Sequence, residues 1–482
     1  MRYLFILLFL CTQSIFAQQA TFIDRSVEMP LVQRCTQVGD KYFLYKPIPS
    51  NWRADGYYIV DKDLNLIRYT NMTYSKDAVD QTDCVLGNSL YCIITKFSKE
   101  NKRLDFIYVN LEKGTDEKVF QSETGNYTKD MLSSLSNYQL FLSPPNRQKM
   151  YRLWQDPLLT TGTYKLFEYD TAFNLVSSRD IGIQENLVYS SENKVSTYLD
   201  NNDNLIISSV DFNGFNTNIG CYPLKTKKYV QKTIGNPKGF CCPKTTYDAN
   251  NSIMYITFDE NDPNEKPFTT VDLDFKQPVA KVIAYNLVQD KLSEFAVKLN
   301  PDEIDSLKDA GNLKKEVNYT FRVETAGTEV FANGNFAIYT AMENFVHHDN
   351  RSSTVIDRGD MEGTNNIILR VYDKNGNLLN SKSLYRSRKY LTIWGGMNVY
   401  MLDNKLLLTC DNRRRNDGEN NVDDGTFPFN FYSIDDTGKV NFIKSRIDKS
   451  VKELPFGVYV NNGIIPMNKR YNKWGFCALM IK

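Results

Sequence analysis

A short pattern of apolar and polar residues recurs along this chain. An apolar or aromatic run is followed by a polar turn built on Asp, Asn, Lys or Gly, and then by a second apolar run; the clearest copies span 57–67, 166–176 and 369–379. Runs rich in aromatic and β-branched residues that flank such turns are typical of β-hairpins. Each copy therefore predicts two antiparallel strands.

Four looser copies bring the number of hairpins to seven. They lie at 108–114, 221–227, 284–290 and 432–438. The turn residues of successive copies are between 50 and 86 residues apart, and further apolar runs, such as 205–208 and 254–258, lie between the hairpins. Each repeat therefore offers about four strands.

Four short strands per repeat, repeated through a chain, are the sequence signature of a β-propeller. We therefore predict an all-β fold, a single β-propeller with about seven four-stranded blades; about six or eight blades also fit the spacing. A chain of two or three β-sandwiches is the alternative, but sandwiches do not repeat one hairpin throughout. Strands from the two ends should close the ring, and we expect 41–45 and 475–481 to share a sheet.

Three segments are predicted to be surface insertions, near 259–279, 300–320 and 411–425. Within the second of them, Asn300-Pro301-Asp302-Glu303 combines an N-cap residue, a proline at the first helical position and a capping-box glutamate, which predicts the start of a short helix. The third holds Arg413, Arg414 and Arg415 in a polar stretch. Planar guanidinium groups on a loop suit a protein interface, so we predict a partner-binding loop there.

The amino terminus indicates export. Arg2 precedes an apolar run over 4–10, and Ala17 precedes Gln18, which is the arrangement of a secretory signal peptide. We expect residues 1–17 to be removed and 18–482 to form the propeller, in the periplasm, at the outer-membrane surface or outside the cell. Lipidation at Cys11 is disfavoured because the large Leu10 precedes it. No later run reaches the ~18 apolar residues of a membrane span.

Composition narrows the classes of function. The chain has 58 Lys and Arg against 57 Asp and Glu, so it lacks the excess positive charge of a nucleic-acid-binding surface. Tyr and Phe are frequent, at 30 and 28 residues, as expected of a β-rich core. The chain has only two histidines, which removes the commonest residue from metal sites and from acid–base catalysis.

Eight of the nine cysteines remain after signal cleavage, an even number in an oxidising compartment. A three-residue loop at 87–89 would place Cys84 directly opposite Cys92 in a hairpin, so we predict a disulfide between these two. Several of the eight cysteines being buried free thiols is the alternative, and the sequence leaves it open.

No catalytic, cofactor or metal-binding motif is found, and we predict none of these sites. His347 and His348 are adjacent in a polar stretch, and adjacent histidines rarely converge on one metal. The run Asp200–Asn204 does not complete an EF-hand loop, so a solvated turn is expected there. A pair of carboxylates for glycoside hydrolysis remains open, because the fold sets the separation between such residues.

The Ala17–Gln18 junction, the Tyr-, Asn- and Lys-rich composition and turns such as 372–379 resemble secreted β-propeller proteins of Bacteroidota-type bacteria. The resemblance implies a binding or scaffolding part of an envelope assembly. We therefore predict a non-enzymatic, exported propeller without a cofactor, whose partner is another envelope or secreted protein. A carbohydrate-binding or carbohydrate-active propeller is the alternative.

Overall fold

A computed structural model gives the fold of the chain. The structure describes residues 20–25, 34–47, 54–63, 65–72, 78–124, 127–133, 139–144, 146–155, 163–182, 193–200, 202–211, 216–224, 230–238, 240–259, 268–269, 280–303, 319–325, 328–346, 367–384, 397–402, 404–411, 429–443, 451–453, 464–471 and 473–481. Within these ranges no helix has the length and apolar character needed to cross a membrane.

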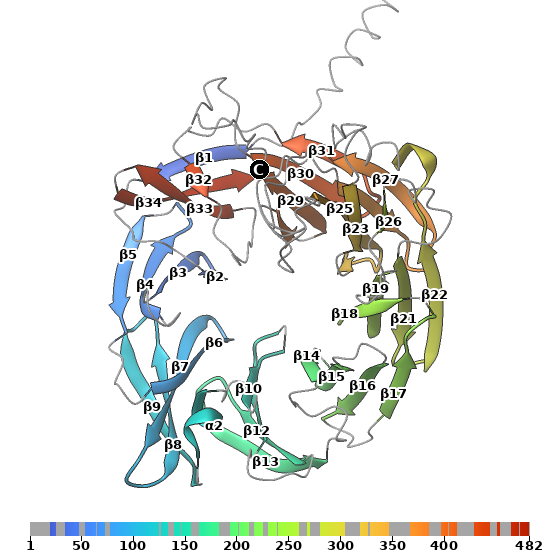
Figure 1. The fold of residues 1–482 in the computed structure, drawn as a ribbon. Coiled ribbons are helices and arrows are strands. Elements are labelled where there is room, and N and C mark those ends of the chain that lie inside the picture. Colours follow the sequence, from blue (N-terminus) through green and yellow to red (C-terminus); the bar gives the residue numbers. More distant parts are fainter. Residues whose placement is uncertain are drawn as a thin grey trace, which may run out of the picture.

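The described strands form eight antiparallel sheets around a ring, seven with four strands and one with six, which confirms the all-β propeller (Figure 1). Blade 1 consists of β2 (Arg34–Val38), β3 (Lys41–Pro47), β4 (Ala54–Asp61) and β5 (Leu66–Asn71), and blade 2 of β6 (Ala78–Leu86), β7 (Ser89–Ser98), β8 (Arg103–Asn110) and β9 (Thr115–Thr124). Blade 3 consists of β10 (Gln139–Leu142), β11 (Met150–Gln155), β12 (Thr163–Tyr169) and β13 (Leu175–Gly182), and blade 4 of β14 (Asn193–Leu199), β15 (Asn204–Asp211), β16 (Asn216–Pro223) and β17 (Val230–Gly235). A short helix, α2 (Lys129–Ser133), lies between blades 2 and 3 in the sequence.

In blades 5, 7 and 8, as in blades 1 to 4, the strands are given from the centre outward, whereas those of blade 6, which has two additional short strands, are given in chain order. Blade 5 consists of β18 (Cys241–Asp248), β19 (Ile253–Asp259), β21 (Ala280–Asn286) and β22 (Lys291–Val297), and blade 6 of β20 (Phe268–Thr269), β23 (Tyr319–Thr325), β24 (Glu329–Val330), β25 (Phe336–Val346), β26 (Ile367–Tyr372) and β27 (Leu378–Leu384). Blade 7 consists of β28 (Met397–Leu402), β29 (Lys405–Asp411), β30 (Phe429–Asp435) and β31 (Val440–Ile443), and blade 8 of β32 (Val451–Glu453), β33 (Ile464–Tyr471), β34 (Lys473–Ile481) and β1 (Ala20–Arg25).

Strand β1 explains why seven hairpins accompany eight blades. In blades 1 to 7 the two outermost strands follow each other in the chain, and these pairs are the seven hairpins of the repeat. In blade 8 the outermost strand is β1, which pairs with β34 from Ala20↔Ile481 to Arg25↔Phe476. The ring is thus closed by strands from both ends, as expected.

The expected partner of the carboxyl-terminal strand was wrong. Residues 41–45 belong to β3, the second strand of blade 1, and pair with β2 and β4. Residues 20–25 occupy the place next to β34 instead. Both segments are short strands near the amino terminus, so the local pattern could not distinguish between them.

The hydrophobic core lies between neighbouring blades. Six clusters of buried side chains each combine residues of two successive blades, from blades 1 and 2 through to blades 6 and 7. The sheets of blades 2 to 6 therefore pack on both faces, and the strands next to the outermost ones are largely buried. In β26 all six residues are buried. This is why these strands appear as continuous apolar runs rather than as alternating ones.

The predicted insertions are described only in part. The backbone amide of Glu303 donates to Asn300 Oδ1 at 2.9 Å and that of Asn300 donates to Glu303 Oε2 at 2.7 Å, so the predicted capping box is confirmed. Residues 268–269 form β20, which pairs with β23. Residues 304–318 and 412–428 lie outside the described residues.

Candidate functional site

In blades 1, 3, 6 and 7, the hairpin of the two outermost strands begins at an aspartate that accepts hydrogen bonds from its own turn. In blades 2 and 5, Asn110 and Asn286 take this place. Asp373 Oδ1 accepts from the backbone amides of Asn375 and Asn377 at 2.8 and 2.9 Å, and its Oδ2 accepts from Asn377 Nδ2 at 2.8 Å. The bond from the Asn377 side chain contributes most to lowering the pKa of Asp373. Corresponding bonds occur in the turns at Asp61 and Asp170, so the turn is fixed locally.

Four of the blades have this hairpin held by the outermost strand of the blade before it. Arg68 in β5 donates to the carbonyl oxygen of Glu112 at 3.2 Å, and Arg179 in β13 donates to that of Leu224 at 2.6 Å. Lys232 in β17 pairs with Asp290 at 3.1 Å, and Asn380 in β27 donates to the Gly438 carbonyl at 2.8 Å. At these four junctions, one side chain therefore links successive blades at the rim.

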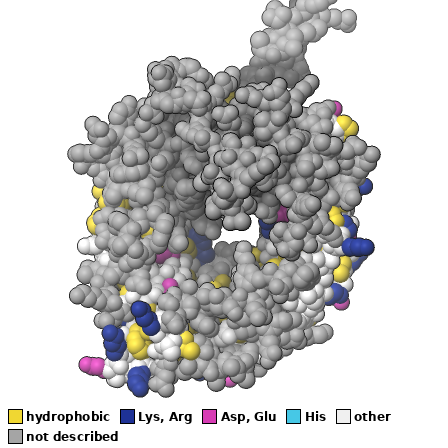
Figure 2. All heavy atoms as spheres, in the orientation of Figure 1, with side chains coloured by type: hydrophobic (Ala, Val, Ile, Leu, Met, Phe, Trp, Pro, Cys, Tyr) yellow, Lys and Arg dark blue, Asp and Glu magenta, His cyan; other side chains and the backbone are white. Residues whose placement is uncertain are grey.

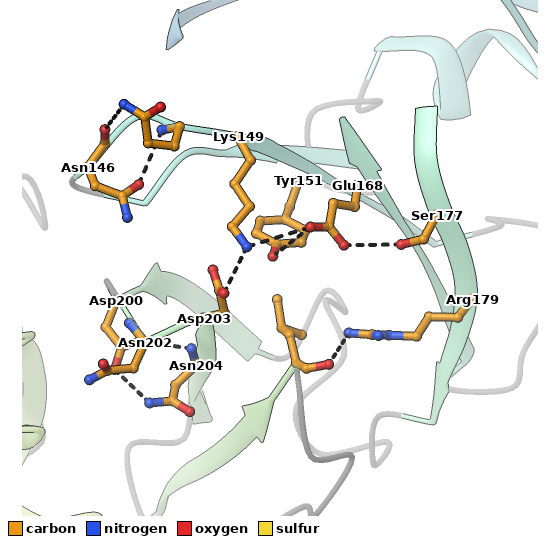
Figure 3. A network of polar contacts seen from close by, with 12 residues as sticks. Asn146, Lys149, Tyr151, Glu168, Ser177, Arg179, Asp200, Asn202, Asp203 and Asn204 are labelled. Carbon is orange, nitrogen blue, oxygen red and sulfur yellow. Dashed lines mark hydrogen bonds and ion pairs between the residues drawn. The ribbon is translucent and has the colours of Figure 1, made fainter. Parts of the chain in front are cut away.

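The junction between blades 3 and 4 adds an ion-pair cluster to this link (Figure 3). Lys149 Nζ lies 2.8 Å from Asp203 Oδ2 of blade 4 and 3.6 Å from Glu168 Oε1 of its own blade. Glu168 also accepts from the Tyr151 hydroxyl at 3.5 Å and from the Ser177 hydroxyl at 3.1 Å. One lysine thus joins carboxylates from two blades.

Burial and charge set the protonation of this cluster. Burial alone would lower the pKa of Lys149, but the hydrogen bonds to Asp203 and Tyr151 outweigh it and raise the pKa, so the lysine stays a cation. Burial raises the pKa of Tyr151 to about 12, so its hydroxyl stays neutral. The cluster therefore consists of paired charges without an activated nucleophile, and its role is to hold blades 3 and 4 together.

The Asp200–Asn204 turn continues the polar contacts into blade 5. Asp200 Oδ1 accepts from the amides of Asn202 and Asn204 at 2.9 and 2.8 Å, and Oδ2 accepts from the Tyr247 hydroxyl at 3.3 Å. Asp200 and Asp203 are buried, so the expected solvated turn was wrong. Both carboxylates bind groups of the protein, because the neighbouring blades cover the turn.

A cavity of about 220 Å³ lies beside this cluster, between β13 and the end of β16. Arg179, which links the two blades, forms part of its wall, and in Figure 3 this side chain extends toward blade 4. Its lining residues are Arg179, Asp180, Ile181, Gly182, Tyr222, Pro223 and Leu224. This cavity is therefore a candidate ligand-binding site at the junction of blades 3 and 4.

The exposed large apolar side chains of the described residues lie on the outermost strands or in the turns that lead to them. Leu66, Leu175 and Leu378 each follow the asparagine that ends a turn, and the next residue of each is also apolar and exposed. The full set is Leu66, Ile67, Tyr69, Leu175, Val176, Val230, Val288, Leu292, Leu378, Leu379 and Phe442. We call this set the apolar rim; parts of it are visible at the edge of the ring in Figure 2.

The predicted disulfide is not formed. The hairpin has a two-residue turn, with Leu86 opposite Ser89, so that Cys84 pairs with Tyr91 and Cys92 with Asp83. This register differs by one residue from the expected one, which places the two cysteines on opposite faces of the sheet. Cys84 packs between blades 2 and 3 and Cys92 between blades 1 and 2, and both are free thiols.

The remaining residues that the sequence singled out are the arginines of the predicted loop and the two histidines. Arg413, Arg414, Arg415, His347 and His348 lie outside the described residues. Within the described part of the chain, no three His, Cys, Asp or Glu side chains gather in a way that could hold a metal ion.

The sequence did not point to Lys149, Glu168, Asp203 or Arg179. Lys149 and Asp203 are 54 residues apart and sit in hairpins of different blades, so no local pattern relates them. A weak signal existed for Arg179, since Arg68 occupies a similar place in an earlier outermost strand.

Comparisons with known proteins do not assign this chain to a family. No family model and no curated protein matches the sequence. The WD40 domain of SCAP from fission yeast is 11% identical over 95% of this chain and 98% of its own, with a TM-score of 0.45. The β-propeller domain of the Trilobed protease from Pyrococcus furiosus is 10% identical over 84% and 94%, with a TM-score of 0.38.

A third solved structure comes from a Bacteroides species. A member of the DUF4221 family from Bacteroides vulgatus is 8% identical over 82% of this chain and 93% of its own, with a TM-score of 0.33. At such identities and TM-scores, these similarities carry no inference about the chain.

Proposed function

We propose that this chain is an exported, non-enzymatic β-propeller that binds another envelope or secreted protein as a scaffold component. The observation that carries the proposal is the apolar rim. Large apolar side chains exposed at a rim cost free energy in water, and clusters of them are common at protein interfaces. The linked turns give this rim a rigid support, which lowers the ordering cost of binding.

The predicted loop at Arg413, Arg414 and Arg415 is a second contact in this proposal. The signal sequence and the resemblance to secreted propellers of Bacteroidota-type bacteria support an envelope or extracellular location. Ring-shaped propellers present many loops and edges at once, which suits a scaffold.

A test of the rim uses three double variants, one for each pair of adjacent exposed residues. Leu66→Ser/Ile67→Ser, Leu175→Ser/Val176→Ser and Leu378→Ser/Leu379→Ser change blades 1, 3 and 6. Each tagged protein is exported in its native cell and cross-linked, and the captured protein is identified by mass spectrometry. We expect at least one double variant to lose at least tenfold of the partner that the wild type captures. Lys291→Ala, also at an exposed position of an outermost strand, is the matched control.

The three double variants should keep the wild-type melting temperature within a few degrees, because they change exposed side chains. Equal capture of one partner by all three variants would refute the rim as the interface. A wild-type protein that captures no protein and binds glycans would refute the scaffold role and favour the second candidate.

Carbohydrate binding is the second candidate, and a tyrosine pair favours it. The rings of Tyr58 and Tyr69 are 4.6 Å apart on β4 and β5, and the side chain of Tyr69 is close to the backbone of Gly56. Tyr69 is exposed, and an exposed aromatic ring of this kind could stack on a sugar ring. A glycan array with wild type and Tyr69→Ala tests this candidate.

The absence of catalysis is part of the proposal, with carboxylate chemistry as its exception. Asp80 and Asp83 lie on β6, the innermost strand of blade 2, where Gln139 donates to Asp80 at 3.0 Å and Tyr57 donates to Asp83 at 2.6 Å. We expect no turnover of glycan, ester or phosphoester substrates. Hydrolysis that Asp80→Asn or Asp83→Asn abolishes would overturn this expectation.

A further inference from the structure

The cavity between blades 3 and 4 combines one cation with an apolar wall. Arg179 donates through Nη2 to the Leu224 carbonyl at 2.6 Å. No acidic side chain in the described part of the chain forms an ion pair with it. A guanidinium has five N–H donors, so the charge and several donors remain available to a ligand in the cavity.

The rest of the lining is largely apolar. Ile181, Tyr222, Pro223 and Leu224 form this part of the wall, and Tyr222 and Leu224 are each 6% exposed. Asp180 also lines the cavity, but alternation along β13 directs its side chain to the face opposite Arg179, where Lys165 is its cross-strand partner. The negative charge of Asp180 therefore does not oppose an anion at Arg179.

The size of the cavity limits the ligand. About 220 Å³ is below the roughly 300–1,000 Å³ of sites for drug-sized molecules, and it matches a single amino-acid residue. An Asp or Glu side chain would bring a carboxylate but little apolar surface. A chain-terminal residue with an apolar side chain carries both groups on one residue.

We propose that this cavity binds the carboxyl-terminal residue of a partner polypeptide, with the α-carboxylate on Arg179 and an apolar side chain against Ile181, Tyr222 and Leu224. Capture of a terminal carboxylate is a recurring mode of peptide recognition. The inference rests on the proposed scaffold function, and it names one chemical feature of the partner. β13 is the outermost strand of its sheet, and among the described residues no further strand pairs with its outer edge.

Two probes test the chemistry on the full exported chain. N-acetyl-leucine carries the carboxylate and the apolar side chain, whereas N-acetyl-leucinamide carries the side chain alone. We expect saturable binding of N-acetyl-leucine in the millimolar range by ligand-observed NMR, and at least tenfold weaker binding of the amide. Equal binding of both probes, or no saturable binding of N-acetyl-leucine, would overturn the proposal.

Two variants locate the binding. Gly182→Leu fills the cavity and keeps Arg179, and it should fold because a Cβ at Gly182 meets no atom within 4 Å. Arg179→Gln removes the cation. We expect both to reduce N-acetyl-leucine binding at least tenfold. Arg68→Gln removes the corresponding link between blades 1 and 2 and should bind like the wild type.

The outcome separates this inference from the scaffold proposal. Binding that persists in Gly182→Leu would place the probe elsewhere and refute the cavity as the site. If Arg179→Gln fails to fold, Gly182→Leu still decides the question. Partner capture that depends on the rim but survives in Gly182→Leu would sustain the scaffold role while refuting the carboxyl-terminal residue as its anchor.

Discussion

At the scale of single residues, burial between blades changes the chemistry of several titratable groups. Glu329 lies in β24, the short strand that pairs with β25 in blade 6. Burial raises the pKa of Glu329 to about 7, and a hydrogen bond with Tyr339 offsets part of that effect. Folding and the protonation of this carboxyl are therefore coupled.

Glu329 should make the protein less stable as the pH rises. The folded protein keeps this proton up to about pH 7, whereas the unfolded chain releases it near pH ~4.3. The stabilisation is therefore complete in acid and is lost as the pH passes through 7. In urea unfolding, the wild type should therefore lose on the order of 3 kcal/mol of unfolding free energy between pH 4 and pH 8. The Glu329→Gln variant should not show this loss.

Glu100→Gln, at an exposed turn position, is the control for this measurement. It should leave the difference in unfolding free energy between pH 4 and pH 8 as in the wild type. A Glu329→Gln variant with the wild-type difference would show that Glu329 is ionised in the folded protein.

The two cysteines of blade 2 should be unreactive until the protein unfolds. Burial raises the pKa of Cys84 to about 12 and that of Cys92 well above its usual value, with nearby Asp83 adding to both shifts. Thiolates react and thiols do not. Mass spectrometry after maleimide treatment should find both unmodified in native protein and modified in urea. Recovery of a peptide linking Cys84 to Cys92 would contradict the observed register.

At the scale of elements, the unit of this fold is a hairpin held by the strand before it. The aspartate fixes the turn, and the previous outermost strand reaches the next turn through Arg68, Arg179, Lys232 or Asn380. Gly438 shows how close this contact is, since it has a φ of +82° and a Cβ there would lie 2.6 Å from Asn380 Cβ. Local turn chemistry and packing between blades therefore act on the same residues.

Loss of Lys149 should destabilise the junction between blades 3 and 4 more than loss of an exposed lysine. The Asp203 side chain is 3% exposed, so Lys149→Met leaves a buried carboxylate without its cation. We expect a loss of roughly 2–3 kcal/mol of unfolding free energy. The matched control, Lys232→Met, breaks a pair whose Asp290 side chain is 64% exposed, and should cost less than ~1 kcal/mol.

A second substitution separates two contributions to this loss of stability, the lost attraction between the charges and the cost of leaving a buried charge unpaired. Adding Asp203→Asn to Lys149→Met removes the stranded charge, so the double variant should regain part of the lost stability. Equal losses for Lys149→Met and Lys232→Met in urea unfolding would argue that Asp203 is hydrated in the folded protein.

At the scale of the whole molecule, the ring is completed by pairing across nearly the entire sequence. Ala20 pairs with Ile481 and Arg25 with Phe476, so blade 8 needs both ends of the chain. Figure 1 shows β1 beside β34 in this closing blade. A propeller without this strand would expose the edge of β34, and exposed edges pair with other chains.

Deleting residues 18–25 after the signal sequence should open the ring. We expect the melting temperature to fall by about 5–10 °C and size-exclusion chromatography to show oligomers formed through the free edge of β34. As the control, the 411–425 segment, which has Val422 as its single apolar residue, is replaced by a short Gly/Ser linker. This change should keep the melting temperature within a few degrees. A monomeric deletion variant with the wild-type melting temperature would contradict the closure.

The sequence alone determined the parts of this protein that depend on neighbouring residues. Seven hairpins, six of them with an Asp or Asn in the turn, the all-β class and the capping box at Asn300 and Glu303 follow from turn chemistry and hydrophobic runs. These signals act over a few residues, so one sequence is enough to recognise them. Tertiary structure confirmed them without changing their positions.

Tertiary structure decided what depends on partners far apart in the sequence. A register shift of one residue separated Cys84 from Cys92, and the choice of β1 over 41–45 set the closing strand. The Lys149 cluster and the cavity at Arg179 exist because hairpins of different blades meet. The free energy of such contacts arises from packing between whole sheets, and no local stretch of sequence carries that information.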